Sequence, residues 1–174
     1  MLILENVVDT LKCDINIDYY VPFTVNVECE DKYGAKVCWR TGNFKNSLIE
    51  IALDARNGIL RDITLISIDK AVLLDTVLED IDDVESGTPV FLLEGNTKNG
   101  IHDHLMNFTV FLGLDFIMVN LEEDSCICKF IELERVRFGI DSNNKLVSIT
   151  IRNLSEFEYG ELKDSLKYRE SNKS

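Results

Sequence analysis

Alternation of apolar and polar residues is the feature that most constrains how this chain can fold. Residues 23–27 read Phe, Thr, Val, Asn, Val, and a similar alternation recurs within residues 63–68 and 136–140. Successive side chains of a β-strand point to opposite faces, so this pattern predicts strands with one buried face. We therefore expect a fold dominated by β-sheet.

Turn-forming residues separate these expected strands. Segments 31–34, 56–58 and 141–144 contain Gly, Asn or Asp, which tolerate a positive φ or hydrogen-bond to their own backbone. Such connections are typical of antiparallel hairpins. Residues 53–65 also resemble residues 140–151 with one gap, which either a duplication or local turn chemistry would explain. In both cases the resemblance supports two hairpins.

The clearest helix signal lies near the C-terminus. Ser155 and Glu158 form a capping box, flanked by a hydrophobic staple. This pattern predicts a helix from about Glu156 to Leu166. The polar tail over residues 168–174 is expected to be frayed.

A second helix is expected over Ala71–Val84, where apolar residues recur every three or four positions and acidic residues fall opposite them. The acidic end of this segment opposes the helix dipole. The fold class that follows is α+β: a mostly antiparallel β-sheet built from hairpins, like a sandwich or half-barrel, with a C-terminal α-helix.

The organisation along the chain indicates a single domain. The 174 residues include two prolines and nine scattered glycines, and no Gly/Ser-rich linker separates two halves. We expect one α+β domain over residues 1–167, followed by the tail over residues 168–174.

The charge balance excludes several classes of partner. The chain has 18 Lys and Arg against 31 Asp and Glu, a formal net charge of −13. Nucleic acid and anionic membrane surfaces both attract clustered cations, which the chain lacks. The longest nearly continuous apolar stretch, residues 110–121, is too short for a bilayer and contains Asp115. We expect no nucleic-acid partner and no membrane partner.

The N-terminus and the cysteines indicate a compartment. The first positive side-chain charge is at Lys12, so no basic region of a signal peptide is present. The five cysteines lack the spacing of a disulfide scaffold, as expected where thiols stay reduced. A cytoplasmic location is therefore expected.

Motifs of catalysis and cofactor binding are absent. The sequence contains no nucleophile elbow, phosphate-binding glycine loop or zinc-protease motif, so we expect a protein that is not an enzyme and has no cofactor. His102 and His104 would share a strand face, and Cys126 and Cys128 could do the same. Because each of these short patterns is a common accident, no metal is predicted. A small-ligand or metal-binding protein that uses the region of His102 and His104 remains an alternative.

Acidic residues gather in one interval. Between Lys70 and Lys98 there is no Lys or Arg. This interval is either a solvated face or a docking surface for a basic partner. Trp39 and Phe44, near an Arg and a glycine turn, form a second possible contact area because aromatic side chains often anchor interfaces. The candidate partner-binding residues are Asp75, Glu79, Asp80, Asp82, Asp83, Glu85, Trp39 and Phe44.

Strand, turn and helix signals occupy residues 46–54, 57–60, 63–65 and 136–141, and then the run from Leu154 into the final helix. Together these blocks resemble the small acidic immunity proteins of bacterial polymorphic-toxin and contact-dependent inhibition systems. The resemblance implies a non-enzymatic protein that binds and neutralises a cognate basic toxin, such as a nuclease. It implies no specific site residues. An adaptor subunit of a larger assembly is a further alternative.

Overall fold

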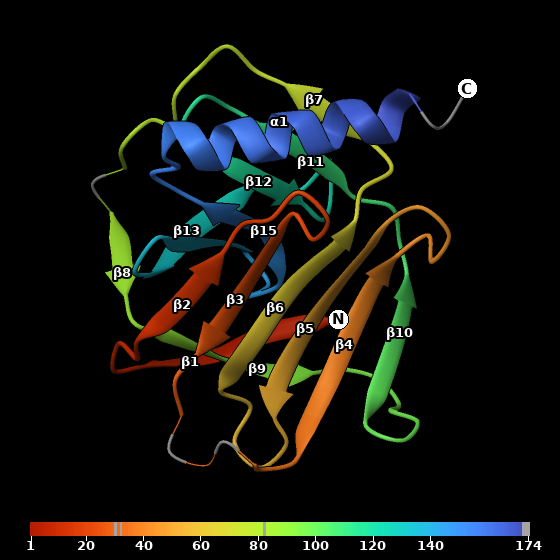
Figure 1. Ribbon diagram of the computed structural model, residues 1–174. Helices are drawn as coiled ribbons and strands as arrows, with labels where there is room; N and C mark the ends of the chain where they lie inside the picture. The colour runs from red at the N-terminus through yellow and green to blue at the C-terminus, as the bar shows by residue number, and fades with distance from the viewer. Residues whose placement is uncertain (30, 32, 82, 172–174) are drawn as a thin grey trace.

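Two β-sheets, a two-stranded ribbon and one α-helix make up the described part of the chain (Figure 1). The computed structural model describes residues 1–29, 31, 33–81 and 83–171, with side chains as far as residue 166. Asp82 therefore lies outside the described residues.

The first sheet consists, in spatial order, of β10 (Ile101–Leu105), β4 (Lys36–Gly42), β5 (Leu48–Asp54), β6 (Leu60–Ser67), β3 (Phe23–Val27) and β2 (Cys13–Asn16). The second sheet consists of β7 (Ala71–Leu73), β11 (Thr109–Leu112), β12 (Ile117–Asn120), β15 (Leu146–Ile151), β14 (Val136–Asp141), β13 (Ile127–Leu133) and β8 (Val84–Ser86). The ribbon pairs β1 (Leu2–Val8) with β9 (Thr88–Leu93), and the helix is α1 (Glu156–Ser171).

Antiparallel pairing dominates both sheets. The parallel pairs occur at sheet edges, where β10 joins β4, β7 joins β11 and β8 joins β13. The sequence-based expectation of an α+β fold with hairpin-built antiparallel sheet and a C-terminal helix is confirmed.

The alternation of residues along the strands places the hydrophobic core. In β3, Phe23 and Val25 are fully buried whereas Asn26 between Val25 and Val27 is exposed. Phe138 and Ile149 of the second sheet belong to the same buried cluster. Each side chain of this size contributes about 1.5–3 kcal/mol to folding when it leaves water.

The two sheets repeat one strand arrangement. The order β4, β5, β6, β3, β2 in the first sheet matches the order β13, β14, β15, β12, β11 in the second, and every neighbouring pair is antiparallel. The registers match as well, since Phe23 lies opposite Leu65 in the first sheet and Ile117 lies opposite Ile151 in the second. Local turn chemistry explains two similar hairpins but not matched sheets, so the structure favours a duplication.

The two equivalent hairpins, β5–β6 and β14–β15, agree in detail. Both ladders are interrupted in the same place, at residues 52–53 and at residues 139–140. At each turn an aspartate carboxylate, that of Asp54 or Asp141, accepts a backbone N–H from the residue two positions later. An aspartate at the equivalent position therefore fixes each of the two turns.

The ribbon connects the two repeats, which are β2–β6 preceded by β1 and β11–β15 preceded by β9. It does so by an exchange of strands. The backbone N–H of Leu4 in β1 donates to the carbonyl of Asn144 in the second hairpin turn (2.7 Å). The N–H of Phe91 in β9 donates to the carbonyl of Gly58 in the first hairpin turn (2.9 Å). Leu4 and Phe91 lie opposite each other in the ribbon. The first strand of each repeat is thus hydrogen-bonded to the hairpin turn of the other repeat.

Helix α1 begins where the capping box predicts. The Ser155 hydroxyl accepts the N–H of Glu158, and the Glu158 carboxylate accepts the N–H of Ser155. The helix buries Leu162 and Leu166 in the core and continues to Ser171, beyond the expected end at Leu166. Residues 168–171, expected to fray, are therefore helical, and residues 172–174 lie outside the described part. No helix in that part has the length and apolar character needed to cross a membrane.

The stability of the protein should depend on pH through Glu158. Its carboxylate accepts hydrogen bonds from the Arg135 guanidinium (2.8 Å) and from the backbone N–H of Ser155. These contacts, chiefly the one with Arg135, lower the pKa of Glu158 to about 2. The resulting stabilisation is present above pH 4.5 and is lost as the pH falls toward 2. Glu158→Gln should therefore lower the free energy of unfolding by about 2 kcal/mol at neutral pH and by progressively less in acid.

Urea denaturation of both proteins between neutral pH and about pH 3 would measure this difference. The exposed Glu156, also in the first helical turn, offers the control Glu156→Gln. If Glu158→Gln lowers the free energy of unfolding by the same amount across this pH range, the ionised Glu158 carboxylate is not the source of the stabilisation.

The helix expected over Ala71–Val84 is wrong. Residues 71–73 form β7, residues 84–86 form β8, and the described residues between them have no regular structure. Acidic side chains at the C-terminal end of a helix are unfavourable, and here the second sheet offers alternative hydrogen-bond partners to the backbone. One such bond runs from the N–H of Leu74 to the carbonyl of Leu112 (2.8 Å).

Candidate functional site

Residues 74–81 and 83 of the acidic interval belong to a strap that joins opposite edges of the second sheet. In Figure 1 the strap leaves β7, arches past the N-terminal end of α1 and descends to β8. Its backbone is held at the β11–β12 turn, where the N–H of Leu114 donates to the carbonyl of Thr76 (2.8 Å) and Asp115 accepts the N–H of Leu78 (2.8 Å). The strap is therefore irregular in secondary structure but fixed by the sheet beneath it.

The described acidic side chains of this interval point to solvent. All are exposed, and only one of them takes part in an ion pair within the described residues. The exposed residues are Asp75, Glu79, Asp80, Asp83 and Glu85. The structure thus places four of the six acidic candidates along the strap and Glu85 on the adjoining β8, while the sixth candidate, Asp82, lies outside the described residues.

Asp80 is the acidic residue that anchors the strap. Its carboxylate, 91% exposed, pairs with Arg152 at 2.7 Å. Arg152 also donates to Glu132 (2.7 Å), which in turn accepts from the buried Arg137 (3.0 Å). This chain of ion pairs ties the strap to the β15 end of the second sheet and leaves the other strap carboxylates uncompensated by a described cation.

Trp39 and Phe44 do not belong to the strap. Trp39 lies on β4 and is only 3% exposed, so it is a core residue and contributes no contact surface. Phe44 follows β4 with a φ of 58° and is partly exposed. Both lie on the first sheet's side of the molecule, so the structure does not unite them with the acidic candidates.

His102 and His104 share one face of β10, as the sequence suggested. Their ring centroids are 6.4 Å apart, and His104 stacks on Trp39 at 6.1 Å. Burial is the main cause that lowers the pKa of His104. Cys126 and Cys128 are exposed and belong to the second sheet's side of the chain. Within the described residues, no group of three or more His, Cys, Asp or Glu side chains is arranged to hold a metal ion.

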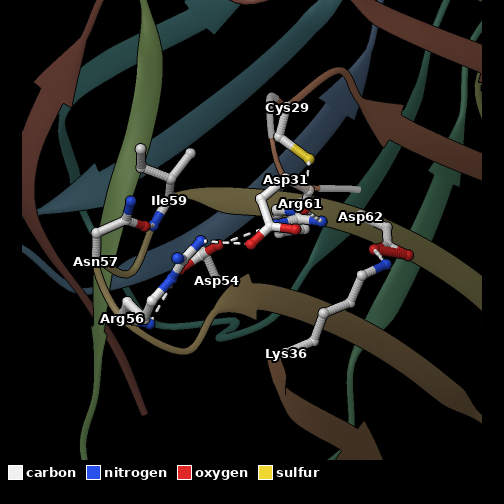
Figure 2. A network of polar contacts seen from close by, with 9 residues as sticks. All are labelled: Cys29, Asp31, Lys36, Asp54, Arg56, Asn57, Ile59, Arg61 and Asp62. Atoms are coloured by element: carbon white, nitrogen blue, oxygen red, sulfur yellow. Dashed lines mark hydrogen bonds and ion pairs between the residues drawn. The ribbon is translucent and has the colours of Figure 1, made fainter. Parts of the chain in front are cut away.

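A polar network at the first hairpin turn was not anticipated from the sequence. Figure 2 shows Arg61, Asp54, Arg56 and Asp31 turned toward one another. The buried Arg61 guanidinium donates to the buried Asp54 carboxylate (2.9 Å) and to the carbonyl of Asp31 (2.7 Å). Hydrogen bonds from Arg56, chiefly from its backbone N–H, lower the pKa of Asp54. Together with Lys12, Arg56 and Arg61 line a cleft of about 800 Å³.

The duplication supplies an internal comparison for this network. Asp54 has the equivalent Asp141 in the second hairpin, but Arg61 corresponds to the buried Val147. The same turn is thus built in the second repeat with an apolar residue in place of Arg61, and so without an ion pair between these two positions. One sequence signal could have located the pair: Arg61 falls in phase with the core residues Ile63 and Leu65.

Comparisons with known proteins give no relative from which a role could be transferred: no protein-family model matches the chain, and no curated protein matches it.

Proposed function

We propose that this chain is an inhibitor of the immunity-protein type, which neutralises a basic protein toxin by binding it through the acidic strap. The observation that carries the proposal is the preorganised strap itself. Its backbone is hydrogen-bonded to the β11–β12 turn and its two ends join strands of the second sheet, while its carboxylates project into solvent. Binding then costs little ordering of the strap, which favours affinity.

Electrostatics supports the same role. Opposite potentials accelerate encounter between proteins and reject partners of like charge. A formal net charge of −13 reinforces the local field of the strap. An inhibitor must capture its toxin quickly and at low concentration, and rapid association meets that need.

Affinity capture from the source cells is the direct test. The tagged chain should retain one basic protein in stoichiometric amount, and this protein should be released when salt is raised from ~0.1 M to ~1 M. Co-expression should then protect cells against the captured protein. A captured partner whose activity the chain leaves unchanged would reject the inhibitor role.

A further inference from the structure

Three exposed apolar side chains lie on segments that meet at Asp115, beside the acidic strap. They are Val77 of the strap, Leu114 of the β11–β12 turn and Phe157 of the first turn of α1, which are 60%, 41% and 74% exposed. Single exposed apolar side chains are common, but exposed apolar side chains on segments that converge indicate an interaction site.

Hydrogen bonds of the β11–β12 turn hold the three segments together. The Asp115 side chain accepts the N–H of Leu78, and its backbone carbonyl accepts the N–H of Leu154, just before α1 (2.9 Å). Leu114 donates to Thr76 on the other side of Val77. The strap, the turn and the start of α1 are thus fixed to one another, and Figure 1 places the strap beside the N-terminal end of α1.

We infer that Val77, Leu114 and Phe157 form the apolar centre of a docking surface whose rim is the carboxylates of the strap. The surface fits a protein face with an apolar spot surrounded by Lys and Arg. This inference rests on the proposed function and adds to it the chemistry of the partner's contact face.

The charge of the rim decides which occupant fits the apolar centre. Exposed Asp75 and Glu79 flank Val77 in the sequence, and Glu156 precedes Phe157. A second copy of this chain would bring like charges together, whereas a cationic rim on the partner would be attracted. Interfaces commonly place apolar or aromatic anchors at the centre, where water is excluded, and charged groups at the rim.

The two parts of the surface should therefore act on different rate constants. The acidic rim should govern the association rate and its salt dependence, and the apolar centre should govern dissociation. A surface that acted through charge alone would bind any polycation of the same charge equally well.

A pair of synthetic peptides tests this distinction with the full chain. Both contain only leucine and lysine and have about 16 residues, enough for four helical turns. In one peptide the leucines form one helical face, and in the other the same residues are scrambled so that no apolar face forms. Fluorescence anisotropy at ~150 mM salt should give at least ~10-fold tighter binding of the first peptide.

Variants of the chain test which residues bind the patterned peptide more tightly than the scrambled one. Phe157→Ala and Leu114→Ala should each reduce the preference for the patterned peptide several-fold while leaving its salt dependence unchanged. Leu105→Ala, on the distant β10 edge and 76% exposed, is the matched control and should have no effect.

The outcomes separate the inference from the proposed function. If both peptides bind equally, and binding is lost when strap carboxylates are reversed, the acidic strap stands and the apolar centre is rejected. If Leu105→Ala weakens binding as much as Phe157→Ala, the location is rejected. If neither peptide binds, the inference and the acidic-strap mechanism of the proposed function both fail.

Discussion

Replacing Arg61 by valine should lower the free energy of unfolding by about 3–5 kcal/mol. Valine occupies the equivalent position, Val147, in the second repeat, so the backbone and the space at this site accept it. The loss arises because the buried Asp54 carboxylate would lose the guanidinium 2.9 Å away and keep only the exposed Arg56, whose Nε lies 3.5 Å away, as a cationic partner. Equilibrium denaturation in urea would measure the difference.

The double variant Arg61→Val with Asp54→Asn separates charge from packing. Asparagine keeps a side-chain oxygen that can accept the N–H of Arg56, so the Asx turn survives without a buried charge. We expect the double variant to recover most of the lost stability, as found when both partners of a buried pair are neutralised. A double variant as unstable as the single one would show that Arg61 acts through its packing.

Because the position equivalent to Arg61 is occupied by Val147 in the second hairpin, the hairpin fold does not require an ion pair between these two positions. Buried pairs add little net stability compared with apolar residues of similar size, while the loss of one partner is costly. Asp54 and Arg61 also border the cleft that contains Lys12. The pair thus distinguishes the first hairpin from the second beside that cleft.

Local signals in the sequence predicted local structure well. The alternation of residues 23–27 and the turn segments 56–58 and 141–144 predicted strands and hairpins, because side-chain direction and turn geometry depend on near neighbours. The capping box at Ser155 located the start of α1 for the same reason. The exchange of β1 and β9 was not predicted, since it depends on contacts between residues far apart in the chain.

The strap shows where local reasoning failed. Residues 71–84 carry an apolar spacing typical of a helix, yet the exposed Val77 belongs to that spacing and the second sheet supplies the backbone partners. The exposure of the described acidic candidates was predicted correctly, because charged carboxylates are rarely buried. Trp39, selected as a contact residue, is in the core because its side chain follows the inward alternation of β4.

Reversing charges on the strap should slow the association with the basic partner by ~10–100-fold at low salt. Suitable changes are Asp75→Lys and Glu79→Lys, because both residues are exposed and neither has an ion pair among the described contacts. Asp80 is left intact, since its pair with Arg152 anchors the strap. Stopped-flow measurement of association with the captured partner at several salt concentrations would give the rates.

A second pair of reversals controls for net charge. Glu5→Lys with Asp124→Lys changes the total charge by the same amount at exposed positions outside the strap. If the field of the strap steers encounter, the strap variant should lose far more of its association rate and of its salt dependence than this control, because field strength falls within a Debye length of about 10 Å. Equal losses in the two variants would mean that the total charge of −13, and not the strap, attracts the partner.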